Sequence, residues 1–373
     1  MKIPLVDLTT HNKLQRKKIS QKIQKLIAKG QFILGDEVTN FEKKFASYIG
    51  TKYCISVASG TDALILSLKA FGIGKDDEVI IPSMTFIATA LAVLHSQATP
   101  VFVDITPDTN LIDYTKIEKA ITKRTKAIIP VHLYGNVCHM NEITKIANKH
   151  NLIIIEDACQ AHGSMYKDKH AGSMGDSAAF SFYPSKNLGA YGDAGAITTS
   201  NKKIAQTLLL LRNYGAKEKY IHTLVGYNSR LDNLQAGVLS IKLETLDKQN
   251  DKRREHVALY SQQLKKLPID FSIVSQNVMS NYHLYTIRVK KRDELLLFLK
   301  NKNIFCGIHY PLPLHLQPAF AFLQYKKGDF PNSEKLSLET LSLPLYPEMT
   351  KKEILYICRQ ISTFFQKTNN ENK

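Results

Sequence analysis

The chain contains no tryptophan and only five cysteines among its 373 residues. The cysteines are odd in number and widely spaced, and they form no Cys-x-x-Cys pair: Cys54, Cys138, Cys159, Cys306 and Cys358. This pattern argues against a disulfide framework and against a structural zinc site. We therefore expect reduced thiols.

Long hydrophobic runs are also absent. Residues 1–10 lack the continuous apolar core of a signal peptide, and no run elsewhere approaches the roughly 20 apolar residues that a membrane span needs. The composition, with 44% hydrophobic residues, predicts a soluble, cytoplasmic globular protein without a membrane partner. Because 373 residues exceed what one hydrophobic core usually supports, we expect two domains in close contact.

Acidic residues are in deficit: 33 aspartates and glutamates stand against 50 lysines and arginines, which gives a formal net charge of +17. Such a charge is compatible with nucleic acid or with a phosphorylated metabolite as a partner. The basic residues are scattered, often in pairs such as Arg253 with Arg254, and no long basic block occurs. Each pair is also explained as a solvated helix face, so we do not expect a nucleic-acid partner.

The region from residue 53 to about residue 176 alternates short β-branched or apolar runs with helical patterns. This alternation is typical of a mostly parallel sheet covered by helices. Residues 152–155 are apolar without alternation, which predicts a central strand buried on both faces. The predicted strands are residues 54–58, 78–81, 99–104, 127–132 and 152–156, and the predicted helices include residues 62–69 and 140–149.

A different pattern follows this region. Residues 178–183 and 195–199 predict two further strands, and the glycine-rich stretch between them contains Lys186. A long helix is expected at residues 231–247, and the polar residues 248–254 after it indicate a hinge near residue 247.

The remainder predicts a smaller unit with a strand at residues 284–289 and a helix at residues 293–301. We therefore expect an α/β protein with a large domain at residues 1–247, which includes an N-terminal arm, and a small α+β domain at residues 248–373.

Lys186 is a candidate for holding the aldehyde of pyridoxal 5'-phosphate covalently. Apolar and aromatic residues precede it, and glycine follows three residues later. In such surroundings burial lowers the pKa of an amine and makes it nucleophilic, and the released amine is also a suitable base for moving a proton. An ordinary exposed lysine after a strand is the alternative.

Asp157 follows the buried run of residues 152–156, and the carboxyl ends of strands in open α/β sheets border the ligand crevice. A carboxylate at that place can pair with a protonated pyridine nitrogen and keep the ring an electron acceptor. A helix cap or a metal ligand are the alternatives. Glu156 is expected to point the other way.

Candidates for the phosphate and the ring of the same cofactor are also present. The segment 59–64, Ser-Gly-Thr-Asp-Ala-Leu, follows a strand and opens a helix, so its free amides favour an anion, although a plain turn with an N-cap explains it equally. Ser181 is a plausible second phosphate ligand or a plain strand hydroxyl. Phe86 could lie flat against a ring or belong to the core.

Four motifs together resemble the DegT/DnrJ/EryC1/StrS family of sugar aminotransferases: residues 60–64, 82–89, 156–163 and 180–189. The resemblance extends from residues 3–8 to the final helix. It implies the aspartate-aminotransferase-like fold (PLP fold type I), a homodimer with shared active sites, and L-glutamate as the usual amino donor. It assigns Lys186 to the aldehyde, Asp157 to the pyridine nitrogen, Phe86 to stacking, Gln160 to the phenolic edge, and Gly60, Thr61, Ser181 and the partner's Asn228 to the phosphate.

The resemblance also implies residues near the sugar: His309, Tyr310 and His315 in a proline-flanked loop, and His162 and Tyr183 elsewhere. Local packing is the alternative for each of them. The stretch 212–215 with Tyr220 and residues 226–232 is more similar to members that aminate C3 of dTDP-3-keto-6-deoxyhexoses. A C4 aminotransferase of the same family, acting on another nucleotide sugar, is the alternative.

Three rival functions remain to be weighed. Family members that are dehydratases carry histidine where this chain has Lys186, which speaks against that branch. A regulatory DNA-binding protein would need a recognition helix or a clustered basic face, and neither is visible. A metal-dependent hydrolase would need ligands such as His132, His162 and His170, but their spacing matches no ligand motif, so we expect no metal.

Overall fold

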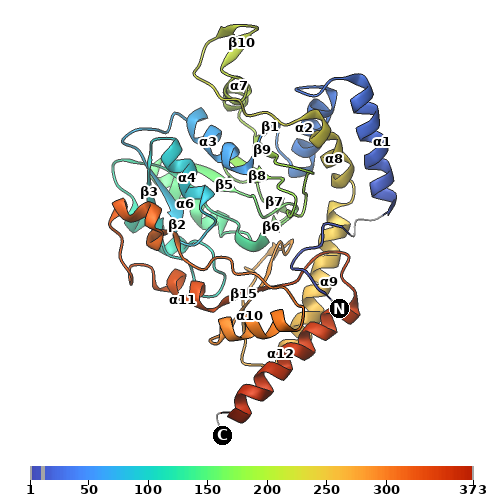
Figure 1. Cartoon of the computed structure of the whole chain (residues 1–373). Helices are drawn as coiled ribbons and strands as arrows, with labels where there is room; N and C mark the ends of the chain where they lie inside the picture. Colours follow the sequence, from blue (N-terminus) through green and yellow to red (C-terminus); the bar gives the residue numbers. More distant parts are fainter. Residues whose placement is uncertain (1, 10–12, 372–373) are drawn as a thin grey trace.

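The computed structural model describes residues 2–9 and 13–371. Its centre is a seven-stranded sheet with the order β1-β9-β8-β5-β4-β2-β3, in which β9 runs against the other strands (Figure 1). The predicted mostly parallel sheet is confirmed. Its strands are β1 (Tyr53–Val57), β2 (Glu78–Pro82), β3 (Thr99–Val103), β4 (Thr125–Ile128), β5 (Ile153–Asp157), β8 (Ser177–Ser181) and β9 (Gly195–Thr199).

Helices cover both faces of the sheet, as the alternating pattern predicted. One face packs against α2, α6 and α8, and the other packs against α3, α4 and α7. The helices of this part are α1 (Lys13–Lys29), α2 (Asp36–Ile49), α3 (Gly60–Ala70), α4 (Ala88–His95), α5 (Tyr114–Ile117), α6 (Met140–His150), α7 (Lys202–Leu211) and α8 (Asn233–Leu243).

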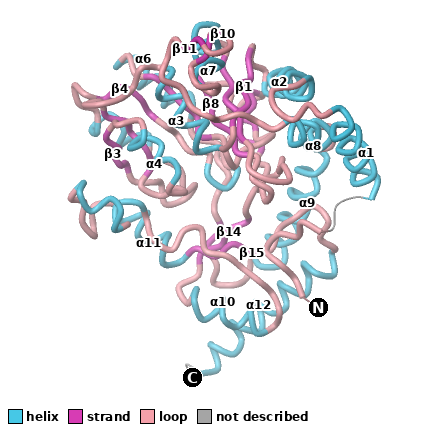
Figure 2. The backbone as a smooth tube through the Cα atoms, turned by 45° about the horizontal axis from the view of Figure 1, so that its top comes forward, coloured by secondary structure: helices cyan, strands magenta, loops and turns pink. Residues whose placement is uncertain are grey.

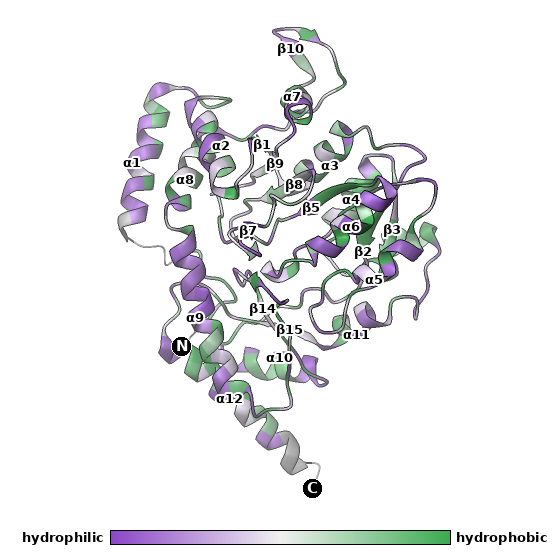
Figure 3. Ribbon diagram, turned by 180° about the vertical axis from the view of Figure 1, so that it is seen from behind, coloured by the Kyte–Doolittle hydropathy of each residue, from purple (hydrophilic) through white to green (hydrophobic). Residues whose placement is uncertain are grey.

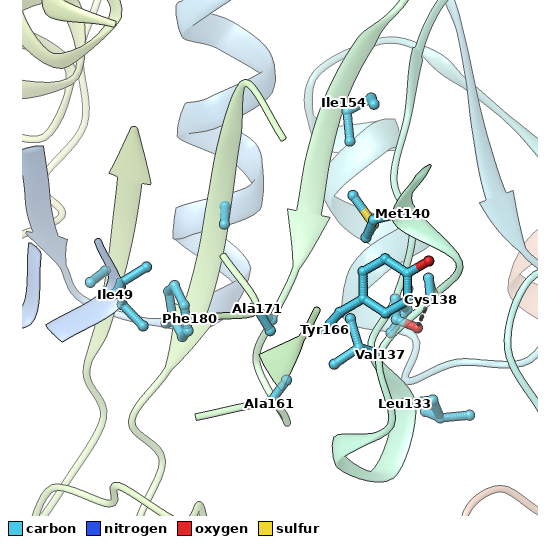
Figure 4. Packing of buried hydrophobic residues seen from close by; sticks show 14 of the residues in the cluster. Ile49, Leu133, Val137, Cys138, Met140, Ile154, Ala161, Tyr166, Ala171 and Phe180 are labelled. Atoms are coloured by element: carbon cyan, nitrogen blue, oxygen red, sulfur yellow. Dashed lines mark hydrogen bonds between the residues drawn. The ribbon is translucent and has the colours of Figure 1, made fainter. Parts of the chain in front are cut away.

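The middle of the sheet is buried on both sides. Successive residues of a strand point to opposite faces, so Ile154 and Ile155 of β5 belong to the two different cores. Figure 4 shows part of the core that contains Ile154. In this view Ile49 of α2 and Phe180 of β8 lie on one side, and Met140 of α6 lies on the other. The prediction of a central strand buried on both faces is confirmed.

Local signals set the ends of the helices beside the sheet. The Ser59 hydroxyl accepts a hydrogen bond from the Asp62 amide at 3.0 Å, so it caps the start of α3. Gly50 ends α2 with a φ of 83°, a left-handed conformation that glycine adopts without strain. These caps place the beginning of α3 directly at the end of β1.

The C-terminal part has a sheet and a core of its own. Its antiparallel strands lie below the central sheet, with α10 and α12 packed next to them (Figure 2). Ile3 pairs with Ile304 and belongs to this core, so the N-terminal segment crosses into the C-terminal part. The elements are α9 (Leu246–Leu264), β12 (Asp270–Phe271), β14 (Tyr285–Arg288), α10 (Arg292–Asn301), α11 (Pro331–Glu339), β15 (Thr340–Leu343) and α12 (Lys351–Glu371).

The boundary between the two parts differs in detail from the expectation. The helix expected at residues 231–247 is interrupted after Leu243, and α9 begins at Leu246. The polar residues 248–254 form part of the first half of α9, whose ribbon is mostly hydrophilic in colour (Figure 3), although Asn250 and Arg253 within it are buried. The hinge near residue 247 stays a prediction. The division into domains 1–247 and 248–373 stays a prediction.

Short elements complete the described chain. A hairpin of β10 (Ala216–Glu218) and β11 (Ile221–His222) projects from the large part beyond α7 (Figure 1). A small sheet joins β6 (Met165–Tyr166), β7 (Lys169–His170) and β13 (Val278–Met279). The 3-10 helices are residues Glu118–Ala120, Leu133–Gly135, Leu314–Leu316 and Pro318–Leu323. Among the described residues, no helix is long and apolar enough to cross a membrane.

Glu156 points away from Asp157, as expected, and joins the segments behind the sheet. Its carboxylate accepts hydrogen bonds from Met174 and Gly175, both at 2.7 Å, and from Gly172 at 2.8 Å, and it lies 2.8 Å from His132 Nε2. Burial opposes its ionisation, but the hydrogen bonds from His132 and from the backbone amides outweigh burial and lower its pKa.

Replacing Glu156 with glutamine should lower the free energy of unfolding by about 3 kcal/mol, because it leaves buried donors without an acceptor. Since the folded pKa is lowered, this stability is present above the unfolded value near 4.5 and is lost as the pH falls. Urea unfolding of the cofactor-free protein at neutral and acidic pH measures both effects. Glu142→Gln, which removes the exposed partner of Lys145, should change stability by less than about 1 kcal/mol; an equal loss in both variants would contradict the assignment.

Candidate active site

The carboxyl ends of β2, β5 and β8 border a cavity of about 370 Å³, which residues of the C-terminal part close on the other side. This is the place where ligands of open α/β sheets bind. The predicted residues that line the cavity are Gly60, Thr61, Phe86, Asp157, Gln160, Ser181, Tyr183, Lys186, His309 and Tyr310. The structure thus brings together residues that are up to 250 positions apart in the chain.

Asp157 ends β5 and is 6% exposed at the floor of the cavity. Its Oδ2 accepts a hydrogen bond from Thr89 Oγ1 at 2.8 Å, and its Oδ1 accepts one from the Cys159 amide at 3.2 Å. Thr89 Oγ1 lies in turn 3.1 Å from Thr85 Oγ1. These contacts fix the carboxylate in one orientation and leave room for a further donor from the cavity.

Lys186 lies in the connection between β8 and β9, residues 182–194, and lines the same cavity. Its amide donates to the Tyr183 carbonyl oxygen at 2.8 Å, which forms a turn. Burial lowers the pKa of its amine, and the nearby Cys159 and Asp157 only partly oppose this. Among the described residues, no hydrogen-bond partner is found for the amine, so it is available for chemistry.

The first turn of α3 presents backbone amides to the cavity. A Cβ added at Gly60 would lie 2.6 Å from Ser181 Cβ and 2.9 Å from Cys159 Sγ, so only glycine lets the helix approach β8 so closely. The amides of Gly60 and Thr61 have no acceptor within the described part of the chain, as is usual in a first helical turn. Together with Ser181 they present donors to the cavity.

Phe86 and Tyr310 face each other across the cavity opening. Their ring centroids are 5.8 Å apart, and Phe86 is 53% exposed although it is a large apolar side chain. A flat ligand could cover this ring. Gln160 is held below them, since its Oε1 accepts from the Tyr134 amide at 2.7 Å and its Nε2 donates to the Tyr310 hydroxyl at 3.2 Å.

His309 and Tyr183 line the outer part of the cavity. His309 Nδ1 lies 2.8 Å from Ser342 Oγ, and burial together with the charge of Lys186 lowers the pKa of His309 to about 4. Tyr183 is 55% exposed. An uncharged histidine and an exposed phenol are suited to hydrogen-bond the hydroxyl groups of a sugar.

His162 and His315 do not reach the cavity, contrary to the expectation. The His162 ring is fully buried between Phe180 and Phe182, with centroids at 5.5 and 5.6 Å, and burial lowers its pKa to about 3. His315 is buried beside α11, where its Nε2 lies 3.0 Å from Glu334. Both residues stand in the right motifs, but their side chains point into packed regions.

Asn228 also lies outside the cavity of its own chain. It is exposed and pairs with Asn213 at the base of the projecting hairpin. Arg212, in the same stretch, has a structural role here, because it forms a buried ion pair with Glu42 and donates to the Ser56 carbonyl oxygen at 3.0 Å. Tyr220 is 83% exposed at the tip of the hairpin.

Ser59 and Leu64, from the predicted segment 59–64, also line the cavity. Further lining residues had no predicted role: Thr85, Ala88, Thr89, Val131, Cys159, Ser185, Asp193, His283 and Leu284. Thr89 was visible as the last residue of the motif 82–89, but its hydrogen bond to Asp157 joins the start of α4 to the end of β5, which only the fold brings together. His283 belongs to none of the recognised sequence motifs.

The cavity fits pyridoxal 5'-phosphate. An amine and two backbone amides without partners among the described residues, a fixed carboxylate and an exposed aromatic ring all line one cavity, and each matches one part of that cofactor. The part of the chain that the structure describes contains no group of three or more side chains able to hold a metal ion. The arrangement suits the transfer of an amino group through a covalently held aldehyde.

Comparison with known proteins agrees with this geometry. The model of the "DegT/DnrJ/EryC1/StrS aminotransferase family" matches residues 13–362. The "dTDP-3-amino-3,6-dideoxy-alpha-D-galactopyranose transaminase" of Aneurinibacillus thermoaerophilus is 48% identical over 97% of this chain and 99% of its own. A "pleiotropic regulatory protein" of Geobacillus stearothermophilus is 44% identical over 98% of this chain and 99% of its own.

The crystal structure of S. venezuelae DesV in complex with a ketimine intermediate superimposes with a TM-score of 0.95. It is 41% identical and covers 97% of this chain and 98% of its own. The family match spans nearly the whole chain, and the fold agrees with it. This chain therefore belongs to the DegT/DnrJ/EryC1/StrS aminotransferase family.

Proposed function

We propose that this protein is a pyridoxal 5'-phosphate-dependent aminotransferase that moves an amino group from L-glutamate to a nucleotide-linked keto-deoxyhexose. The observation that supports this most directly is the Lys186 amine, which faces the same cavity as the Asp157 carboxylate and has no partner within the described residues. The lowered pKa of Lys186 increases the neutral, nucleophilic fraction of the amine at physiological pH.

Each side chain of the cavity has a separate role in the transfer of the amino group. When bound, pyridoxal phosphate supplies an aldehyde to carry the amino group and a ring to accept electrons. Lys186 holds the aldehyde and, once released, moves the proton at the reacting carbon. Asp157, fixed by Thr89, keeps the pyridine nitrogen protonated. The first turn of α3 and Ser181 bind the phosphate, and Phe86 covers the ring.

We place the sugar at the outer part of the cavity, near Tyr183, His309 and Tyr310. The names of the relatives support a dTDP-linked 3-keto-6-deoxyhexose as acceptor, with a dTDP-3-amino-3,6-dideoxyhexose as product. The positive net charge of the chain favours the diphosphate of such a substrate. An aminotransferase that acts at C4 of another nucleotide sugar is the alternative.

The acceptor is tested by supplying L-glutamate with dTDP-3-keto-6-deoxyhexose or with a 4-keto nucleotide sugar and by identifying the product by mass spectrometry and NMR. We expect amination at C3 of the dTDP-linked sugar. Amination of the 4-keto sugar alone would reject the C3 assignment and leave the aminotransferase activity standing.

We further propose a homodimer in which the Asn228 side chain of one chain completes the phosphate site of the other. The exposure of Asn228 outside its own cavity and the exposed apolar side chains of the adjoining hairpin support this. Ile221 is 55% exposed and Val225 is 95% exposed. Exposed apolar side chains that lie together in this way are typical of an interface.

Mixing two inactive variants tests the shared site. Lys186→Ala and Asn228→Ala should each have low activity, but a mixture that is unfolded and refolded together should recover about a quarter of wild-type activity, because half the dimers then contain one intact site of two. No recovery, with a dimer observed by light scattering, would show that Asn228 does not act across the interface. Refolding each variant alone is the control.

A further inference from the structure

Behind Lys186, three buried asparagine side chains join the loops of the active site. Asn187, which follows Lys186, donates from its Nδ2 to Asn250 Oδ1 at 2.8 Å and to the Asn281 carbonyl oxygen at 3.1 Å. Asn281 donates in turn to the carbonyl oxygens of Gln160 and His162, at 3.1 and 3.0 Å. Each amide nitrogen faces oxygen acceptors, so the orientation of these side chains is determined.

This network also determines the tautomer of His283. Since the Asn187 nitrogen is used by two oxygens, the atom that lies 3.2 Å from His283 Nδ1 is the Asn187 Oδ1. An amide oxygen only accepts hydrogen bonds, so His283 Nδ1 must carry the proton. A neutral ring protonated at Nδ1 has a free lone pair at Nε2.

His283 stays neutral in its surroundings. It is 8% exposed, and its pKa is lowered well below its usual range, first by burial and then by the positive charges of Lys186 and Arg253 and by the neighbouring His162 and His309. His283 and Lys186 line the same cavity. Within the described residues, neither Nε2 of His283 nor the amine of Lys186 has a hydrogen-bond partner.

We propose that His283 is a positioning residue for Lys186: its Nε2 accepts a hydrogen bond from the free Lys186 amine and aims that amine at the reacting carbon. This inference rests on the proposed function, because it concerns the steps in which the amine is not attached to the cofactor. A neutral acceptor suits the task, since a charged histidine would repel the ammonium group. The bond to Asn187 occupies Nδ1, so Nε2 is the ring nitrogen that remains for a partner in the cavity that His283 lines.

Two substitutions separate the two nitrogens of the ring. In His283→Asn the side-chain amide occupies the position of Nδ1, so it keeps the donor to Asn187 and removes the acceptor. In His283→Gln the amide reaches the position of Nε2 and keeps an acceptor there. His256→Asn makes the same change on α9, where the His256 Nε2 lies 3.3 Å from the Pro347 carbonyl oxygen outside the cavity.

The measurement is the rate at which cofactor-free protein develops visible absorbance with pyridoxal 5'-phosphate, followed against pH. The midpoint of this profile reports the pKa of the Lys186 amine. An acceptor favours the ammonium form, so His283→Asn should lower the midpoint by about one pH unit, whereas His283→Gln and His256→Asn should stay close to wild type. Equal midpoints for the Asn variant and wild type, or equal shifts in the Asn and Gln variants, overturn the inference.

Two further readouts complete the test. With α-deuterated L-glutamate, the isotope effect on the half-reaction should increase in His283→Asn while KM changes less than about twofold, because only the proton transfer loses its alignment. In the wild-type protein, ¹⁵N NMR of the imidazole should show His283 protonated at Nδ1, and the opposite tautomer contradicts the inference even if the variants do not fold. A wild-type protein without visible absorbance would reject the proposed function itself.

Discussion

Replacing Lys186 with alanine is expected to abolish the visible absorbance of the bound cofactor and to lower kcat by more than about 10³-fold. The methyl group can neither hold the aldehyde nor move the proton, and no other amine lines the cavity among the described residues. Absorbance spectra and single-turnover rates with L-glutamate measure the two losses separately.

Lys186→Arg separates the ability of Lys186 to form a covalent link from its positive charge. Arginine keeps the positive charge but does not form the covalent link, so this variant should be as inactive as Lys186→Ala. Lys203→Ala, in the exposed first turn of α7, should behave like wild type. Turnover near the wild-type rate in Lys186→Ala would end the proposed mechanism.

Asp157→Asn is expected to bind the cofactor but to lose about 10²-fold or more in kcat. In the wild-type structure the Thr89 hydroxyl and the Cys159 amide lie 2.8 and 3.2 Å from the Asp157 carboxylate oxygens. The oxygen of the asparagine side chain can still accept one of these hydrogen bonds, so the local structure should persist. It cannot stabilise a protonated pyridine nitrogen, so the ring loses its electron-accepting form. Cofactor titration followed by single-turnover kinetics checks both halves of the expectation.

The outcome also decides between the alternative roles of Asp157. A helix cap predicts a change in thermal stability with an unchanged rate, and a metal ligand predicts a loss that added metal restores. Asp168→Asn, an exposed residue outside the cavity, is the matched control for the removal of one negative charge. An unchanged rate in Asp157→Asn would move the pyridine partner to another residue.

Features that depend on neighbouring residues could be predicted from the sequence. The β-branched run 153–155 favours a strand in the middle of a parallel sheet, where both of its faces are buried. The carboxyl end of this strand places Asp157 at the cavity. Gly60 and the N-cap Ser59 likewise indicated, from adjacent residues alone, that the first turn of α3 would present free amides. Lys186 could be placed because the aromatic residues before it and the glycine after it form a recognisable local motif.

Features that depend on distant residues could not be predicted. The motif that contains His162 was recognised, but only packing against Phe180 and Phe182 decides that its ring turns away from the cavity. His283 reaches the cavity through a network of three asparagines from separate segments, which leaves no local pattern. The break after Leu243 falls inside the helix predicted at residues 231–247, because no glycine or proline marks it in the sequence.

The most direct measurement is the visible absorbance spectrum of the purified protein with pyridoxal 5'-phosphate, recorded before and after the addition of L-glutamate. A visible band that forms with wild type, fails to form with Lys186→Ala, and is lost when glutamate aminates the cofactor is the predicted result. Folded wild-type protein that binds no chromophore would contradict the account.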